Sequence, residues 1–420
     1  MNAQTSTALD PTDAALLDRV QRETLRYFWE FAHPVSQMAR ERSNRAFGYG
    51  AETVTTGGTG FGIMALIVGV ARGWLDRAET AERLNALTQF LATSPTYHGV
   101  FPHFMNGDTG TTIPFMQRDN GGDIVETSFL ISGLLCARTF FDGPGEAAMR
   151  DRIDRLWDDV DWRWHARGEK GALLWHWSPE HGWAMNHSIR GWNECLITYL
   201  LAAGSRTHAI DPATYHEGWT NCSFFQNGRT YHDVVLPLGL PSGGPLFFTH
   251  YSFMGLDPRQ LRDRYADYWQ QNTAHAEINY RHCVENPNGY KGYGRDCWGL
   301  TASDSVEGYA AHAPGNDRGV ITPTAALASI PYTPEASLRA LHFFDGYQGG
   351  RLWGDYGLMD AFSPHHDWIA ASHLAIDQAP IVVMIENYRS GLMWDLFMTI
   401  PEVQAGLQRL DFQAPVKLVA

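Results

Sequence analysis

The chain has little of what membrane, nucleic-acid-binding and disulfide-rich proteins depend on. Its 420 residues contain no run of eighteen apolar residues, so no membrane span is predicted. The formal net charge of -14 argues against nucleic acid or an anionic polysaccharide as main partner, because phosphate and uronate groups bind to basic surfaces. The five cysteines are scattered without a CxxC pair, and Cys136 and Cys195 lie in apolar segments typical of the core. We therefore expect a monomer that binds a neutral partner and needs no metal or other cofactor.

Several common signals and motifs are also missing. Residues 1–11 lack the basic and apolar regions of a secretory leader. We expect a periplasmic or secreted protein if a leader was removed from the sequence, and a cytoplasmic protein otherwise. There is no HExxH, GxSxG or Walker lysine motif. The segment 58–62 resembles a dinucleotide loop, but Ile63 replaces its last glycine and no strand precedes it. His365-His366-Asp367 offers metal ligands, although such a loop more often contacts substrate or solvent.

Aromatic residues and glycine are abundant instead. The chain has 15 Trp, 17 Tyr and 21 Phe beside 41 Gly, and many of them share polar, loop-like stretches. Aromatic faces stack on the C–H faces of pyranose rings, while neighbouring polar side chains bind the hydroxyl groups. This composition is typical of a sugar-binding cleft.

The hydrophobic pattern predicts two kinds of helix. Amphipathic stretches predict outer helices at residues 16–29, 77–91, 146–160, 258–271 and 334–344. Segments that are apolar on nearly every side predict buried inner helices at residues 60–70, 124–141, 189–203 and 379–384. Strand patterning is scarce apart from residues 230–238. We expect an all-α (α/α)6 toroid, a double ring of six inner and six outer helices with long functional loops, as a single domain over residues 1–420.

Carboxylates stand at the starts of two of the predicted inner helices. Asp119, Asp123 and Glu126 open one of them, at spacings that share a face if the helix covers all three. Glu194 stands near the start of the other, so parallel inner helices would bring both acidic ends to one mouth. Glycosidic cleavage needs such a pair, in which a protonated carboxyl donates to the leaving oxygen and an ionised one activates water or attacks.

The two acidic ends differ in their surroundings. Glu194 is flanked by Trp192 and a run of apolar residues, and this desolvation favours a raised pKa and the role of acid. The other three acids lie at a helix N-terminus, where the dipole favours the ionised form and the role of base. Capping is the commoner role of a first-turn acid, and it is favoured for Asp123 alone. A second acid on an apolar helix supports catalysis, because an unpaired buried charge is costly.

Segments spread over nearly the whole chain resemble, in order, the bacterial glucoamylase-like domain. They are TGFG (59–62), DNGGDIVET (119–127), LWHWSP (174–179), GWNE (191–194), CWGLTA (297–302), GVITPTAA (319–326), IDQ (376–378) and IENYR (385–389). The DNGGDIVET form most resembles the endo-β-1,2-glucanases of glycoside hydrolase family 144. The resemblance implies endo cleavage of β-1,2-glucan to sophorooligosaccharides with inversion.

The resemblance also implies roles for individual residues. It makes Glu194 the general acid and leaves Asp119, Asp123 and Glu126 as candidates for the base. The expected glucose contacts are Trp175, His176, Trp177, Arg190, Trp192, Asn193, Trp298, Tyr356, Asn387 and Arg389, although packing is an equally good reason for any single Trp.

Other activities fit parts of this pattern. Related domains act as retaining transglycosylases, and an exo-acting, sophorose-releasing enzyme would need only a blocked end of the cleft. Polysaccharide lyases also use helical toroids, but the acidic net charge counts against a uronate substrate. A non-catalytic glycan-binding protein would keep the aromatic loops and tolerate loss of the acids.

Overall fold

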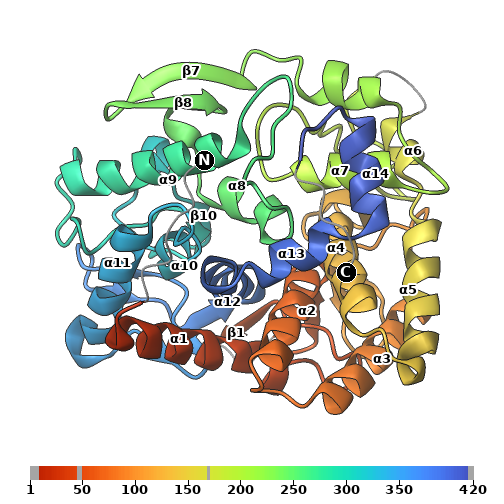
Figure 1. Cartoon of the computed structure of the whole chain (residues 1–420), viewed down its shortest axis with the longest axis horizontal. Coiled ribbons are helices and arrows are strands. Elements are labelled where there is room, and N and C mark those ends of the chain that lie inside the picture. Colours follow the sequence, from red (N-terminus) through yellow and green to blue (C-terminus); the bar gives the residue numbers. More distant parts are fainter. Residues whose placement is uncertain (1–8, 45–49, 168–170, 415–420) are drawn as a thin grey trace.

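Helices dominate the computed structural model, which describes residues 9–44, 50–167 and 171–414 (Figure 1). The helices are α1 (Pro11–Glu30), α2 (Thr56–Ala71), α3 (Arg77–Thr93), α4 (Ile124–Phe140), α5 (Ala147–Asp159), α6 (Trp162–Ala166), α7 (Leu196–Gly204), α8 (Phe247–His250), α9 (Tyr268–Glu285), α10 (Pro323–Leu327), α11 (Pro334–Gly346), α12 (Ala375–Arg389), α13 (Leu392–Met398) and α14 (Pro401–Arg409). None of the described helices is both long and apolar enough to cross a membrane.

The strands are short and pair only in ribbons of two or three among the described residues. They are β1 (Arg42–Asn44), β2 (Thr53–Thr55), β3 (Phe104–Asn106), β4 (Thr112–Ile113), β5 (Gly122–Asp123), β6 (His176–Trp177), β7 (Gln226–Tyr231), β8 (Val234–Leu238), β9 (Ala302–Ser303), β10 (Ala310–Ala311), β11 (Trp353–Gly354), β12 (Gly357–Leu358), β13 (Phe362–Ser363), β14 (Trp368–Ile369) and β15 (Ser372–Leu374). The strand predicted at residues 230–238 is part of the β7–β8 hairpin. The fold is therefore all-α, as the sequence predicts.

The helices that are apolar on every side lie inside the molecule. α2 packs between α4 and α12, and α7 packs against α14. In Figure 1, α9, α11, α1, α3 and α5 follow the outside, while α12, α10 and α4 lie further in. One hydrophobic cluster extends from Leu17 to Leu410 and contains the fully buried Trp157, Trp219 and Trp298.

Two predicted helices differ from the structure. The inner helix predicted at 189–203 begins only at Leu196, because Gly191 has a φ of +78° and the chain turns there. The outer helix predicted at 258–271 is mostly loop, and α9 begins after Asp267, whose side chain caps it. Apolar residues of both loops pack into the core, which gives them a helix-like hydrophobic pattern.

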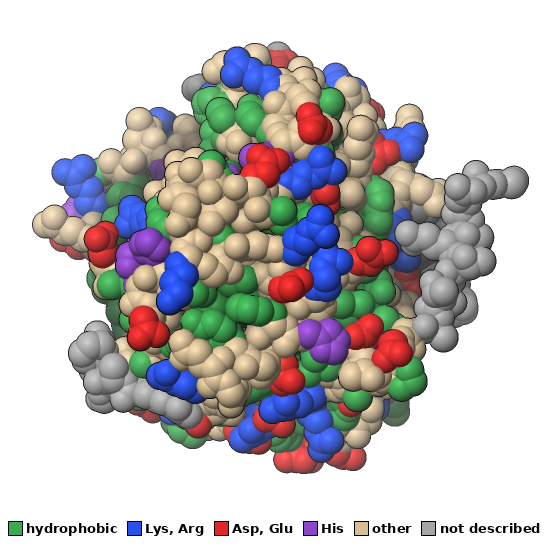
Figure 2. Space-filling view, turned by 90° about the vertical axis from the view of Figure 1, so that its left-hand side faces the viewer, with side chains coloured by type: hydrophobic (Ala, Val, Ile, Leu, Met, Phe, Trp, Pro, Cys, Tyr) green, Lys and Arg blue, Asp and Glu red, His purple; other side chains and the backbone are tan. Residues whose placement is uncertain are grey.

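The charged surface has no single sign. Figure 2 shows acidic and basic side chains interspersed over one face, around patches of hydrophobic side chains. The described part of this face carries no continuous basic patch of the kind that nucleic acids need. All five cysteines, including the buried Cys136 and Cys195, are free thiols.

The glycines of segment 58–62 serve helix packing. A Cβ on Gly60 would lie 2.1 Å from the carbonyl oxygen of Phe129, and a Cβ on Gly133 would lie 2.1 Å from the carbonyl oxygen of Gly60. α2 and α4 therefore meet backbone to backbone, an approach that only glycine allows. This contact fixes the starts of the two helices relative to each other.

Gly60→Ala is expected to lower the free energy of unfolding by about 1–3 kcal/mol, because backbone atoms have to move to make room for the methyl group. Denaturant unfolding measures the change. Gly145→Ala is the matched control, since a Cβ at Gly145 meets no atom within 4 Å. Equal free energies of unfolding for the two variants would contradict the close backbone contact between α2 and α4.

Candidate active site

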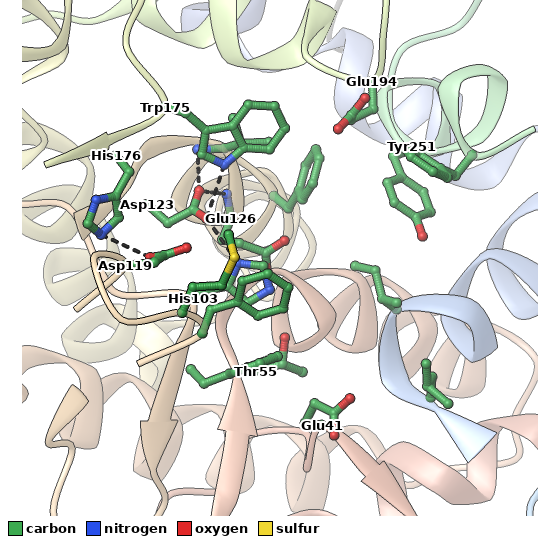
Figure 3. A pocket seen from close by; sticks show the side chains of 18 of the residues that line it. Glu41, Thr55, His103, Asp119, Asp123, Glu126, Trp175, His176, Glu194 and Tyr251 are labelled. Atoms are coloured by element: carbon green, nitrogen blue, oxygen red, sulfur yellow. Dashed lines mark hydrogen bonds and ion pairs between the residues drawn. The ribbon is translucent and has the colours of Figure 1, made fainter. Parts of the chain in front are cut away.

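The starts of α2, α4, α7 and α12 surround one cavity of about 650 Å³ (Figure 3). Its size is within the range of about 300–1,000 Å³ that is usual for ligand pockets. The cavity is lined by Glu41, Arg42, Thr55, His103, Phe104, Phe115, Met116, Asp119, Asp123, Val125, Glu126, Phe129, Trp175, His176, Met185, His187, Glu194, Phe247, Tyr251, Tyr309, Leu374 and Ile376. The structure thus brings the four predicted acids, Asp119, Asp123, Glu126 and Glu194, to one aromatic-walled space.

Asp123 is the N-cap of α4, as expected for that residue taken alone. Its Oδ1 accepts hydrogen bonds from the backbone N–H groups of Val125 and Glu126, each at 3.0 Å. Its Oδ2 accepts one from Trp175 Nε1 at 3.1 Å and lies 3.0 Å from His103 Nδ1. Burial alone would raise the pKa of Asp123, but these hydrogen bonds and the charge of His103 outweigh it and lower the pKa. Asp123 is therefore ionised, with both oxygens engaged.

His103 is a cavity residue that the sequence did not single out. Its ring stacks on Phe115 with centroids 4.5 Å apart and faces the acid cluster. Burial alone would lower the pKa of His103, but the charges of Glu126, Asp123 and Asp119 and the bond to Asp123 raise it to about 9. His103 therefore carries a positive charge at neutral pH.

Glu126 differs from the prediction of an ionised cluster. Burial raises its pKa to about 7, and the charge of Asp123 adds to the effect, against the opposing charge of His103. Its Oε2 accepts a hydrogen bond from the N–H of Gly57 at 2.8 Å, in the first turn of α2. Desolvation thus outweighs the helix dipole at this position.

Asp119 lies in the turn before β5, so it does not share a helix face with Asp123 and Glu126 as the spacing suggested. β5 pairs with β6 in the register Asp123↔His176, which places the His176 ring beside Asp119. His176 Nε2 lies 2.9 Å from Asp119 Oδ1 and also 3.1 Å from the N–H of Gly121. Apart from this ion-pair contact, Asp119 Oδ1 has no hydrogen-bond partner among the described residues, and the side chain is part of the cavity wall.

Glu194 lies across the cavity from this cluster, close to Tyr251 (Figure 3). It precedes α7, and its own backbone carbonyl accepts a hydrogen bond from Ser252 Oγ. Burial raises the pKa of Glu194 to about 7, and the charges of Glu126 and Asp123 add to the effect. The predicted rise in this pKa by desolvation is confirmed.

Two of the ten predicted glucose contacts, Trp175 and His176, line the cavity, and Trp175 stacks on His187 at 5.0 Å. Three others lie outside it. Trp177 joins an aromatic cluster on the surface, and Arg190 is exposed. Asn193 accepts a hydrogen bond from the N–H of Cys195, which helps to start α7.

The other five predicted contacts do not line this cavity, and their side chains contact other parts of the protein. Trp192 packs among buried aromatic rings, and Trp298 donates to the carbonyl oxygen of Ala336. Tyr356 stacks on Phe31. The side chains of Asn387 and Arg389 are bonded within the protein, the first to Met254 O, Met393 N and Trp394 N and the second to Gln21 and Asp18. Their motifs reflect the fold rather than the cavity.

The cavity wall also holds a charged pair, Arg42 and Glu41, that the sequence motifs do not indicate. Arg42 binds Glu41 at 2.9 Å and Asp304 at 3.0 Å, and both Arg42 and Glu41 line the cavity. Tyr251 and Tyr309 complete this side. The charge-rich run around Arg40–Arg42 resembles an ordinary solvated surface, so the sequence carried no signal for it.

One group among the described residues has the spacing of metal ligands, and it is not the segment 365–367. His103, Asp119 and Asp123 each place one potential ligand atom within 4.8 Å of the others. His365 instead accepts a hydrogen bond from the N–H of Lys291 and packs edge-on against Tyr290. The His103 group is already held together by a hydrogen bond and by opposite charges.

Comparison with known proteins assigns the chain to a family. Residues 186–401 match the Glycoamylase family, described as "Putative glucoamylase". An endo-β-1,2-glucanase from Chitinophaga pinensis, solved with sophorotriose and glucose, is 50% identical, with 98% of this chain and 100% of that chain covered at a TM-score of 0.94. The exo β-1,2-glucooligosaccharide sophorohydrolase (non-reducing end) of Parabacteroides distasonis is 43% identical over 97% of this chain, which spans 59% of that protein's length.

A more distant structure shares the fold alone. An endo-β-1,2-glucanase from Talaromyces funiculosus is 11% identical, with 95% of this chain and 90% of that chain covered at a TM-score of 0.67. The all-α architecture thus extends beyond recognisable sequence similarity. With a family match over half of its length and relatives that align along nearly all of it, the chain belongs to the Glycoamylase family.

Proposed function

We propose that the protein is a glycoside hydrolase that cleaves the β-1,2-glucosidic bonds of a neutral glucan. The observation that carries the proposal is the position of Glu194, whose pKa is raised to about 7, across one aromatic cavity from a group of acids that includes the ionised Asp123. Relatives named as β-1,2-glucan hydrolases support the linkage. The acidic net charge fits a neutral substrate.

In the proposed mechanism Glu194 is the general acid. Its raised pKa keeps it protonated up to about pH 7, so it can donate to the glycosidic oxygen as the bond breaks. A carboxylate on the opposite wall takes a proton from the water that attacks the anomeric carbon. The positions of the two groups on opposite walls support inversion, because a water molecule has to fit between the base and the sugar.

We propose Asp119 as the base. Asp123 has both oxygens occupied by hydrogen bonds, and the pKa of Glu126, raised to about 7, makes it a mixture of protonated and ionised forms near neutral pH. Asp119 lines the cavity, and its Oδ1 has no hydrogen-bond partner among the described residues beyond the ion-pair contact with His176. The positive charge of His103 lies beside the carboxylates of this wall.

The attack is proposed to be endo, as the family resemblance implies and as the endo-β-1,2-glucanase aligned over its entire length supports. The sophorohydrolase favours exo attack, but this chain spans only 59% of that protein. The arrangement of α2, α4, α7 and α12 inside and α1, α3, α5, α9 and α11 outside supports an (α/α)6 double ring in a single domain.

The test is incubation with linear β-1,2-glucan, laminarin and starch, with NMR of the first products. We expect sophorooligosaccharides of mixed length from β-1,2-glucan alone, released as the α-anomer. Release of sophorose alone would indicate exo attack, and release of the β-anomer would indicate retention. Cleavage of laminarin or starch alone would overturn the linkage. Binding without cleavage would make the protein a glycan-binding protein.

A further inference from the structure

A second hollow, of about 410 Å³, lies on the surface and is lined by Asp161, Arg163, Trp164, Arg167 and Trp183. We call it the Trp164 hollow. Trp164 is 36% exposed, whereas most tryptophans of the chain are buried or half-buried. Exposing a large aromatic side chain to water is unfavourable, so an open tryptophan in a concave surface indicates a ligand site.

The rings of Trp164 and Trp183 are held in place by other aromatic side chains. Trp164 stacks on His98 with centroids 3.9 Å apart and planes at 19°, so one face of its ring is covered. Its ring also contacts Trp177 edge-on at 5.7 Å and Trp183 at 6.0 Å. Trp183 in turn meets His165 edge-on at 5.3 Å. Rings fixed in this way lose little conformational entropy when a ligand stacks on them.

Polar groups surround the rings. The Asp161 carboxylate accepts a hydrogen bond from the N–H of Trp164 at 3.0 Å, and Arg163 donates to the carbonyl oxygen of Thr207 at 3.0 Å. With Arg167 they place both donors and acceptors beside an aromatic platform. Stacking faces with hydroxyl-binding groups at their rim suit a sugar ring better than a purely apolar ligand.

The Trp164 hollow adjoins the proposed catalytic cavity. Trp183 lines the hollow, while Met185 and His187 of the same loop line the cavity. Neighbouring Cα atoms are about 3.8 Å apart, so the Cα atoms of Trp183 and Met185 are separated by at most about 7 Å. The short strand β6 also links the two, because His176 faces the cavity and Trp177 contacts Trp164.

We propose that the Trp164 hollow binds a glucose unit of a glucan chain that extends out of the cavity. The identity of that chain rests on the proposed function. A distal contact of this kind strengthens the binding of long chains and leaves short ones, which the cavity alone holds, unaffected. The protein would therefore prefer polymer to short oligosaccharides.

The test compares Trp164→Ala and Trp183→Ala with the parent on linear β-1,2-glucan and on sophorotetraose. We expect the KM for the polymer to rise about two- to tenfold, since one aromatic contact contributes up to about a factor of ten in affinity. The kcat/KM for the tetramer should not change. Trp164→Phe should restore much of the polymer affinity because it keeps a stacking face.

Trp353→Ala is the matched control. Trp353 is half-buried, its ring is covered on one face by the Arg19 guanidinium at 3.9 Å, and it lines neither the Trp164 hollow nor the catalytic cavity. This variant should match the parent on both substrates. A Trp164→Ala variant that loses activity equally on polymer and tetramer, or that keeps the parent KM for polymer, overturns the proposal.

Affinity electrophoresis in gels that contain each glucan separates this proposal from the proposed function. Retardation of the parent that Trp164→Ala and Trp183→Ala reduce supports the hollow, even if no glucan is cleaved. Equal retardation of parent and variants overturns it. Retardation that disappears at high salt would show that Arg163 and Arg167 bind an anionic ligand, which also overturns a neutral sugar.

Discussion

Replacing Glu194 with Gln is expected to lower kcat about 10²- to 10⁴-fold, because the amide has no proton to give to the leaving oxygen. The KM should change little, since Gln has nearly the same shape. Initial rates of reducing-end release from β-1,2-glucan measure both values. A variant with the turnover of the parent would exclude Glu194 as the acid.

The pH dependence of the parent follows from the same carboxyl group. Burial raises the pKa of Glu194 to about 7, so the fraction in the donating form falls as the pH rises through that value. The basic limb of kcat/KM should therefore lie near pH 7, well below the raised pKa of His103 at about 9. A basic limb near pH 9 would assign it to His103 instead.

Stability distinguishes a catalytic from a structural role of Glu194. Its pKa is raised on folding, so the folded state loses stability as the pH rises from the ordinary value of 4.5 through about 7. A neutral Gln avoids this loss, and at pH 8 Glu194→Gln should be more stable than the parent by up to about 3 kcal/mol. Denaturant unfolding at pH 5 and pH 8 tests the sign.

Glu402→Gln is the matched control for this change. Glu402 is also buried, but its carboxylate binds Arg138 at 2.7 Å. Burial alone would raise its pKa, and this ion pair outweighs burial and lowers it. Loss of the charge there should lower stability at pH 8 by about 1.5–3 kcal/mol, the opposite sign to Glu194→Gln. Joint loss of activity and stability in Glu194→Gln would indicate a structural role.

The parts of the fold that the sequence predicts well are those with an uninterrupted hydrophobic pattern. α2 and α4 are apolar on nearly every side over three turns, and residues 379–385 of α12 form a shorter apolar run, a pattern that is typical of a buried helix. The prediction fails at 189–203 and 258–271, where turns and caps interrupt a pattern that only resembles a helix. A local backbone conformation such as the positive φ of Gly191 cannot be predicted from a single sequence, because glycine also occurs in many other conformations.

The residues of the site, like the helices, are predictable from the sequence where they stand beside a clear hydrophobic pattern. Glu194 and Asp123 stand next to apolar helices, so their charge is conspicuous in the sequence, and both line the cavity. His103 and Arg42 come from loops and strands far away along the chain, and nothing in their neighbourhood marks them. Conversely, Trp298 lies in a conspicuous motif and yet is fully buried, because a tryptophan can serve packing as well as stacking on sugar.

Comparison of Asp119→Asn with Asp123→Asn should distinguish the catalytic base from the residue that holds the site in place. Asp119→Asn is expected to lower kcat about 10²- to 10⁴-fold with unfolding unchanged, because it removes only the proton acceptor. Asp123→Asn should lower both activity and stability. In one orientation the Asn amide keeps its oxygen on the α4 cap and turns its N–H₂ group toward the N–H donors of His103 and Trp175. In the other orientation it no longer caps α4, and loss of a helix cap costs about 1 kcal/mol.

The pKa of His103 provides the second measurement for these variants. The charge of Asp123 and its hydrogen bond help to raise the pKa of His103, so this pKa should fall in Asp123→Asn, which NMR of the imidazole can follow. Asp119 is a weaker influence on His103, and Asp119→Asn should leave that pKa closer to the parent value. If Asp119→Asn keeps the turnover of the parent while Asp123→Asn loses it with an intact fold, the base is Asp123, and Asp119 serves only to orient His176.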